Sequence, residues 1–527
     1  MARVTILGAG LAGLSAALFL AKQNTPCDLI APAPSERAQS VMAEGGINGC
    51  LDVMGEDDSP RLHFEDTMRG GVWLADPNAV WGMTQAAPGI IRRLDAIGVP
   101  FQRENGKIIQ RNFGGQKKKR TAYAKSSTGK AIMTALIDEV RRYEVQGLVR
   151  RFCPYVLQQL VLEEGTCRGV DVRQIYTGET LRFSGPVLLA FGGYNGLFTG
   201  MTTGTTLNSG DALAKVFAQG VELANLEFMQ YHPTTAAISG KRMLVSEAAR
   251  GEGGRLFCLA EGKKRYFMEE KYPEMGNLSP RDVISREEAF LGSQAYLDMS
   301  GISKKQWTER LSDLREEVQH YLGIDPAKEA IPVSPGIHFF MGGISVDEAH
   351  RTNIPGLYAA GECACQYHGA NRLGGNSLLG AVYGGDTAAR TILQQIGESK
   401  DSELQILRNA PEEQVAPGFA QELTDLLMRG MGILRTENNI LSTIEGLDEM
   451  LSSNANPAEK RRILLGKAMA MCALNRKESR GAHTRLDFPE TSEDLRRHSI
   501  VRMRGEEIDW TLREVPVFRG EEEGETR

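Results

Sequence analysis

Five short polar clusters set charged or imidazole side chains beside glycine or proline. Neither a helical nor a strand period accounts for these residues, so we expect each cluster to lie on a loop. One such cluster alone is more often structural, but five in one chain predict a shared site. The clusters are QYHPT with His232, SEAARGEGG with Ser246, Glu247 and Arg250, SPRD with Arg281, HFFMGG with His338, and HGANRLGGNSLL with Arg372, Asn376 and Ser377.

The side chains in these clusters suit a small dianion. Arg281 and Arg372 each offer a forked, permanently charged donor pair that matches a carboxylate. His232 and His338 add donors for a second carboxylate. The sequence has no Ser-His-Asp pattern, and the two histidines lack a carboxylate partner with which to hold a metal. We therefore predict no metal site and expect a bound cofactor to supply the chemistry.

The elements that must position these loops begin with a nucleotide-binding pattern. RVTILG predicts a buried strand, LAGLSAALFLAKQ the helix after it, and PCDLIAP a second strand. Gly8-x-Gly10-x-x-Gly13 lies at the first turn, where it places a pyrophosphate on the helix N-terminus. The acidic residue expected at the end of the second strand is missing, because that strand runs into Ile30-Ala31-Pro32. We expect backbone groups to hold the adenosine end instead.

The sequence pattern changes twice along the chain. From 226 to 338, charged stretches such as KKRYFMEEKYPEM and ISKKQWTERLSDLREEVQHYLG predict helices between glycine-rich turns, and strand and helix patterns of the first kind then return. We therefore predict an α/β fold in which a nucleotide-binding domain, 1–225 and 339–394, is interrupted by an insertion. A helical domain at 395–490 and a C-terminal tail at 491–527, loose in its RGEEEGETR end, follow.

Composition and charge narrow the class of protein. At 527 residues the chain is too long for one hydrophobic core, and its net charge of −6 argues against a nucleic-acid partner. No apolar run reaches the roughly 18 residues that a membrane span needs. The eight cysteines include no Cys-x-x-Cys pair. We expect reduced thiols, no metal redox centre in this chain and a cytoplasmic location.

Longer motifs run in order through nearly the whole chain, from residue 4 to about 490. They include SVMAEGGING, RNFGGQ, EFMQYHPT, SPRDVISR, HFFMGGI, GLYAAGECACQYHGANRLGGNSLLGA and ALNRKESRGAH. Together they resemble the flavoprotein subunit of succinate dehydrogenase and fumarate reductase, in a superfamily with L-aspartate oxidase. The resemblance implies that the cofactor is FAD, that the nucleotide-binding domain is Rossmann-like, and that the insertion is an α+β capping domain.

The resemblance also assigns residues to the cofactor. The segment Ala43 to Gly46 would pass beside the isoalloxazine ring, where larger side chains would collide with flavin or substrate. Glu362 and the Asn376-Ser377-Leu378 segment would hold the ribityl chain and the ring. The full implied cofactor-binding set is Gly8, Gly10, Gly13, Ser40, Ala43, Glu44, Gly45, Gly46, Asp211, Glu362, Asn376, Ser377 and Leu378.

A second set of residues is implied for the substrate. Arg281 would act as the proton donor to the double bond, fed by Glu247 and Arg250, while the cofactor exchanges hydride through flavin N5. The reaction would interconvert fumarate and succinate, as in oxidoreductases that act on CH–CH bonds. The residues implied to bind the C4 dicarboxylate are His232, Ser246, His338 and Arg372, with Phe113 beside them.

Three other functions remain open at this stage. L-aspartate oxidase needs a group for the substrate ammonium, and in that family a glutamate occurs in a segment like EGGHS. The matching segment here is RNFGGQ, where Phe113 offers at most a modest cation–π contact. A reductase of another unsaturated carboxylic acid is a second alternative. An inactive flavin-binding scaffold is a third, although the intact set of Glu247, Arg250 and Arg281 argues against it.

Position 39 departs from the membrane-bound respiratory members of the family. Those enzymes carry a histidine there that is covalently joined to FAD, whereas this chain has Gln39 between Ala38 and Ser40. An amide is not nucleophilic toward the flavin 8α carbon, so we predict non-covalent FAD. Losing the electron-withdrawing histidyl link should lower the flavin potential, which favours fumarate reduction as the working direction.

The electron partner must come from outside this chain, since it has no cluster or haem motif of its own. We expect a separate iron–sulfur subunit in that role. Association with the cytoplasmic face of a membrane would then depend on partner subunits.

Overall fold

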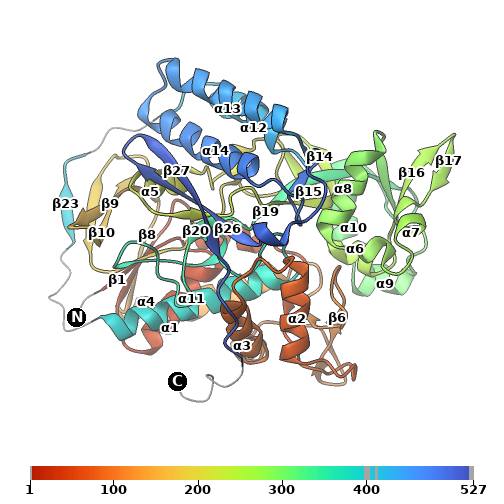
Figure 1. Cartoon of the computed structure of the whole chain (residues 1–527). Helices are drawn as coiled ribbons and strands as arrows, with labels where there is room; N and C mark the ends of the chain where they lie inside the picture. Colours follow the sequence, from red (N-terminus) through yellow and green to blue (C-terminus); the bar gives the residue numbers. More distant parts are fainter. Residues whose placement is uncertain (1–2, 397–403, 410–413, 521–527) are drawn as a thin grey trace.

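The computed structural model describes residues 3–396, 404–409 and 414–520 (Figure 1). A five-stranded parallel sheet, ordered β21-β12-β1-β2-β8, lies at its centre. Its first strand and the helix after it, α1 (Leu11–Lys22), occur where the sequence predicts them. The strands are β21 (Leu357–Ala359), β12 (Val187–Leu189), β1 (Val4–Leu7), β2 (Cys27–Ile30) and β8 (Val149–Phe152).

The predicted interruption of this sheet is visible in its strand order. β21 follows the insertion in sequence but pairs in parallel with β12, Val187 opposite Leu357. The next helix, α11 (Asn376–Gln395), packs against α1, which also contacts α4 (Thr128–Val145). The nucleotide-binding domain is therefore completed only by chain that comes after the insertion.

The inserted segment contains a six-stranded sheet, ordered β15-β14-β19-β18-β16-β17, and a group of short helices, drawn in green in Figure 1. Two long strands, β14 (Met229–Ile238) and β19 (Ile331–Phe340), run side by side between the main body and this lobe. The remaining elements are β15 (Lys241–Leu244), α6 (Glu247–Gly251), β16 (Arg255–Ala260), β17 (Lys263–Arg265), α7 (Phe267–Lys271), α8 (Arg281–Leu291), β18 (Ala295–Asp298), α9 (Lys304–Glu309) and α10 (Ser312–Leu322).

Two helical predictions in the insertion need correction. KKRYFMEEKYPEM begins as strand β17, which pairs with β16, and only its middle forms the short helix α7. The stretch predicted as one helix from Ile302 is divided into α9 and α10. Charge density misled the first prediction, because exposed edge strands also carry lysine and arginine.

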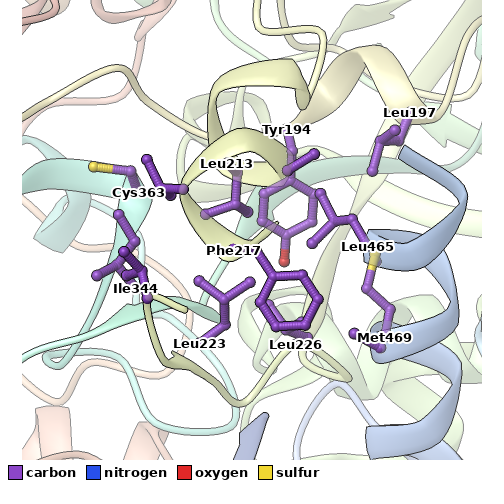
Figure 2. Close-up of a cluster of buried hydrophobic side chains, with 14 of the residues drawn as sticks. Tyr194, Leu197, Leu213, Phe217, Leu223, Leu226, Ile344, Cys363, Leu465 and Met469 are labelled. Atoms are coloured by element: carbon purple, nitrogen blue, oxygen red, sulfur yellow. The ribbon is translucent and has the colours of Figure 1, made fainter. Parts of the chain in front are cut away.

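Three helices follow α11 and form the predicted helical region, drawn in light blue at the top of Figure 1. They are α12 (Phe419–Met431), α13 (Glu437–Ser452) and α14 (Pro457–Asn475), and each contacts the other two. Figure 2 shows how α14 joins the body: Leu465 and Met469 pack with Phe217 of α5 (Asp211–Ala218) and with Leu223 and Leu226. The helical region therefore shares one hydrophobic core with the nucleotide-binding domain.

The segment predicted as a tail from 491 contains regular structure. β26 (Arg497–Arg504) and β27 (Glu507–Glu514) form an antiparallel hairpin closed at Gly505, and β26 pairs with β13 (Leu223–Ala224). The many charges of these strands hid the buried residues of β26, which are the run Ser499-Ile500-Val501 and then Met503. The predicted loose end, RGEEEGETR, lies outside the described residues from 521 onward.

Among the described residues, no helix is long and apolar enough to cross a membrane. That part of the chain likewise contains no group of three or more histidine, cysteine, aspartate or glutamate side chains that could hold a metal ion.

Candidate active site

One long cavity brings most of the predicted site residues together. It begins at the N-terminus of α1 and ends between the main body and the inserted lobe. Residues from segments far apart in sequence line it, as the motif analysis predicts. The expectation that each cluster lies on a loop is wrong: His232 and His338 are on strands β14 and β19, and Arg281 begins helix α8. The predicted residues on its wall are Gly8, Gly10, Ser40, Ala43, Glu44, Gly45, Gly46, Phe113, Asp211, His232, Ser246, Glu247, Arg281, His338, Glu362, Arg372, Ser377 and Leu378.

The glycine turn at the start of the cavity is shaped by close backbone contacts. A Cβ on Gly13 would lie 1.9 Å from the Gly8 carbonyl oxygen, so this glycine lets α1 sit directly against β1. Gly8 has a φ of +124°, and its Cβ would lie 2.0 Å from the Ala190 oxygen. Gly10 faces more open space, 3.6 Å from the Ser40 hydroxyl. The helix N-terminus is thus exposed to the cavity, where it favours a phosphate.

The end of β2 lacks a carboxylate toward the cavity, as its sequence indicates. Ile30, Ala31 and Pro32 line this part of the wall. The nearby Glu36 instead forms an exposed ion pair with Arg141, 2.6 Å apart. The ribose of a dinucleotide would therefore meet backbone and apolar groups here.

The glycines of SVMAEGGING are required by contacts within the protein as well. A Cβ on Gly45 would lie 2.9 Å from the Phe113 ring, and a Cβ on Gly46 would lie 2.5 Å from Thr121 Cγ2. Both glycines also line the cavity. They therefore let Phe113 and Thr121 approach the segment closely, and the predicted contact with a ligand stays a prediction.

Glu247 is the central charge of the polar end of the cavity. It is the first residue of α6, and its carboxylate accepts hydrogen bonds from Arg281 Nε at 2.9 Å and Nη2 at 2.5 Å. The Gly114 backbone N–H donates to its other oxygen at 2.8 Å, and Arg250 lies 3.6 Å away. Burial acts to raise the pKa of Glu247, but Arg281 and Arg250 outweigh it and hold that pKa below its usual value.

Gln230 links the two predicted arginines, a role that the sequence analysis missed. Its side-chain oxygen accepts from Arg281 Nη1 at 3.0 Å, and its nitrogen donates to the Arg372 carbonyl at 2.7 Å. Gln230 is the first residue of the QYHPT cluster, and its membership of that cluster is the one signal in the sequence that could have identified it. Arg372 Nη1 donates to Ser377 at 3.1 Å, whereas its buried Nε has no partner among the described groups.

His232 and His338 lie side by side with ring centroids 5.1 Å apart. Burial, followed by the charge of Arg281, holds the pKa of each well below its usual value, so both rings are neutral near pH 7. His232 Nδ1 lies 3.2 Å from the Thr234 carbonyl, which can only accept. The proton of the neutral ring is therefore on Nδ1, and Nε2 can donate to a carboxylate only after a second proton binds.

Three of the predicted residues lie behind the cavity wall. Gly13 serves helix packing, and Arg250 donates to the Asn277 carbonyl at 2.7 Å. Asn376 bonds through its side chain to Asn48, His63 and Thr67, so its amide orders the protein around α11. Asp211 does line the cavity, but its carboxylate already pairs with Lys215 at 2.9 Å.

Comparison with known proteins places this geometry in a family. A model of the FAD binding domain matches residues 3–378, and a model of the fumarate reductase flavoprotein C-terminal region matches residues 458–520. The chain belongs to the succinate dehydrogenase and fumarate reductase flavoprotein family. It is accordingly an FAD-dependent oxidoreductase, as the motifs predict.

Two curated relatives illustrate the range of the family. The succinate dehydrogenase flavoprotein subunit of Bacillus subtilis is 37% identical and aligns over 93% of this chain and 92% of its own length. L-Aspartate oxidase of Pyrococcus furiosus is 35% identical, over 95% of this chain and 99% of its own. Among solved structures, a mutant of E. coli quinol fumarate reductase FrdA superposes with a TM-score of 0.87 at 28% identity, covering 99% of this chain and 97% of that one.

The residues of the cavity fit FAD. The helix N-terminus behind Gly10 suits a pyrophosphate, and the wall of small residues from Ala43 to Gly46 suits a flat ring. Glu362 stands farther along the same wall, where its carboxylate accepts from the Phe340 backbone N–H at 3.2 Å.

Glu362 should make the stability of the FAD-free protein depend on pH. Burial raises its pKa from 4.5 to about 7, so the folded state holds the proton more tightly than the unfolded state does. Its contribution is fully present below pH 4.5 and is lost as pH rises through 7. The free energy of unfolding should fall by at most about 3 kcal/mol over this pH range, and solvent in the cavity makes the change smaller.

The measurement is urea unfolding of wild type and Glu362→Gln at pH 5 and pH 8. The stability of wild type relative to the variant should fall between these two values. Glu164→Gln, at an exposed turn, is the matched control and should leave the pH dependence unchanged. A wild-type advantage that grew with pH would contradict the raised pKa.

Proposed function

We propose that this protein reduces fumarate to succinate with FAD bound non-covalently in the cavity. The observation that carries the proposal is the excess of positive charge at the polar end of the cavity. Arg281, Arg372 and Arg250 bring three guanidinium groups into a buried region, against the single ionised carboxylate of Glu247. Burial, and then the like charge of Arg281, lowers the pKa of Arg372, which indicates a shortage of negative charge. A dicarboxylate dianion supplies that charge.

Different residues around this charge would bind the two ends of the substrate. Arg372 has a buried Nε without a described partner, which suits it to hold one carboxylate with a forked pair of hydrogen bonds. Ser246, His232 and His338 then hold the other end of the substrate. Because neutral His232 offers no proton at Nε2, the dianion would draw a proton onto this ring as it binds.

Arg281 is the proposed proton donor. Bound FAD supplies the hydride chemistry that no side chain offers. A guanidinium is a poor acid in water, but the carbanion that forms beside it is a far stronger base. Glu247, joined to Arg281 by two hydrogen bonds and close to Arg250, returns the proton through the relay. Gln230 keeps Arg281 and Arg372 in a fixed relation.

The alternative substrate is L-aspartate, since one relative is an L-aspartate oxidase. Its ammonium would need an ionised carboxylate. Phe113 is buried against Gly45 and offers only its ring, and the Glu247 carboxylate is already engaged by Arg281. Glu44 also lines the cavity, but burial raises its pKa well above the usual value, which favours its neutral form. These surroundings favour fumarate.

Gln39 also lines the cavity, and its side-chain oxygen accepts from the Thr205 backbone N–H at 2.6 Å. That bond fixes the amide at the position where relatives with a tether carry histidine. The reduced flavin would receive its electrons from a separate iron–sulfur subunit. Without the electron-withdrawing tether, the flavin potential is lower, which favours giving electrons to fumarate.

The purified protein should oxidise reduced viologen in the presence of fumarate. A dianion site with Phe113 in place of a carboxylate predicts this activity, and predicts little oxidation of L-aspartate by oxygen. Both assays should be run on the same preparation. Aspartate oxidation without fumarate reduction would overturn the proposal.

Arg281→Lys and Arg372→Lys should fail in different ways. Lysine loses the planar fork, so Arg281→Lys should lower kcat by about 10²- to 10⁴-fold with flavin still bound. Arg372→Lys should mainly raise KM for fumarate, by roughly 10- to 100-fold, because it loses a charged hydrogen bond made in both ground and transition states. Steady-state kinetics separate the two effects.

The matched control for both variants is Arg265→Lys, at an exposed ion pair of the inserted lobe. It should retain wild-type kinetics. Equal losses of kcat at unchanged KM in both site variants would show that their roles are not divided in this way.

Acid precipitation tests the cofactor linkage. Since Gln39 cannot attack the flavin, the yellow colour should remain in the supernatant. Flavin fluorescence that migrated with the denatured chain on a gel would disprove the non-covalent linkage and the directional argument built on it.

A further inference from the structure

A buried carboxyl group on α8 has no counterpart in the mechanism above. Glu288 is only 7% exposed, and neither of its side-chain oxygens has a hydrogen-bond partner in the described part of the chain. Leaving a buried polar group unpaired costs about 1–3 kcal/mol, more for a charged one. A methionine or leucine could pack here without that cost. The position therefore favours a functional explanation.

The orientation of α8 places Glu288 on the same side as Arg281. The two residues are seven positions apart, which is close to two helical turns, and both are buried. Ser285, between them, donates to the Tyr231 carbonyl at 3.3 Å. This face of α8 therefore lies on β14, the strand that carries Gln230 and His232.

Arg250, the last group of the relay, also has unfilled hydrogen-bonding capacity, although it lies 3.6 Å from Glu247. Its Nη1 donates to Asn277, but its Nε and Nη2 are buried without hydrogen-bond partners among the described residues. The charge of Arg250 acts to lower the pKa of Glu288, and the charge of Glu288 acts to raise the pKa of Arg250. Glu288 and Arg250 are thus two buried groups with unfilled hydrogen-bonding capacity that influence one another electrostatically, although no direct ion pair joins them in this structure. Catalytic hydrogen bonds are often long before substrate binds.

The other charged groups around Glu288 leave Arg250 as its natural partner. Arg242 on β15 also acts on it, but its Nε donates to Thr235 and its Nη2 to the Ser334 carbonyl. On β14 and β19, the pKa shifts of His232 and His338 arise from burial and from arginines rather than from Glu288. The adjacent Glu287 turns away, toward Lys271 and Tyr272.

We propose that Glu288 extends the relay of Arg281, Glu247 and Arg250 by one step toward solvent, as the acid that resupplies its proton. The inference rests on the proposed function. Arg281 gives an N–H proton to the substrate carbon and receives one from Arg250 by way of Glu247. Glu288 in its acid form gives its O–H proton to Arg250 and then takes one from solvent. Each group ends as it began, one proton has entered, and no electron moves along this path.

The surroundings of Glu288 agree with this role. Burial raises its pKa well above the usual value, against the opposing charges of Arg250 and Arg242, so the acid form persists toward neutral pH. Arg242 is only partly buried, and it marks the side from which a proton can arrive.

The decisive variant is Glu288→Gln, which keeps the shape but cannot release a proton. At saturating fumarate its kcat should fall about tenfold or more, while KM and the shift of the flavin absorbance on fumarate binding stay unchanged. Wild-type turnover should decline as pH rises through the raised pKa of Glu288. The pH profile of the variant should lack that decline. Glu287→Gln is the matched control, since it removes the neighbouring carboxylate and leaves the relay intact.

A second variant separates the relay from a structural role. Glu288→Met removes an unpaired buried carboxyl, so it should raise the thermal midpoint while losing turnover as Glu288→Gln does. Wild-type turnover and an unaltered pH profile in either variant would overturn the relay alone. A wild type unable to reduce fumarate would overturn the proposed function, and this inference with it.

Discussion

The active site depends on keeping one buried carboxylate ionised. Glu247 receives two hydrogen bonds from Arg281 and one from the Gly114 backbone, so two other segments converge on it. Space for it comes from glycine: a Cβ on Gly114 would lie 2.6 Å from one carboxylate oxygen, and a Cβ on Gly374 would lie 2.8 Å from the other. The first glycine of each pair in RNFGGQ and RLGGNS is thus explained by the adjacent charge, whereas Gly115 and Gly375 are required by their positive φ values of +79° and +85°. Removing one partner of such a buried pair typically costs about 3–5 kcal/mol.

The same constraint orders the rest of the polar region. Gln230 attaches to Arg281 on one side and to the Arg372 backbone on the other, and β14 carries His232 two residues later. The inserted lobe contributes Glu247 and Arg281, whereas the main body contributes Gly114 and Arg372. The proposed site is therefore formed only when lobe and body are docked. In the proposed mechanism, any motion between them would change both proton supply and substrate binding.

Much of this arrangement could be predicted from the sequence, because its motifs record local backbone geometry. Gly8, Gly10 and Gly13 indicate a strand, a turn and a helix within one stretch, and the strands and helix occur where expected. Arg281 and Glu247 were placed in one site from separate motifs, and they form a direct ion pair. The requirement for glycine at position 45 could not be predicted from the adjacent sequence, because the ring that it accommodates belongs to Phe113, far along the chain.

What the sequence could not predict depends on long-range burial. Gln230 and Glu288 look like ordinary polar residues until the fold buries them, and only then does the presence or absence of a partner acquire meaning. The hairpin β26–β27 was missed for the converse reason. Its strands carry charges on their exposed side, and their apolar side finds a neighbour only through β13, more than half the chain away.

The late position of β21 has a consequence for how the protein is made. Strand β12 leaves the ribosome long before β21, its partner at the sheet edge, because the whole inserted lobe is translated between them. At about 5–20 residues per second, the roughly 170 residues between Leu189 and Leu357 delay closure of the sheet by roughly 8–34 seconds. During that interval the apolar edge at Val187–Leu189 has no strand beside it, which is a template for misassociation. Nascent chains of this protein therefore carry an open sheet edge until β21 emerges, and the cavity, whose wall includes residues up to Ala381, is complete only after that point.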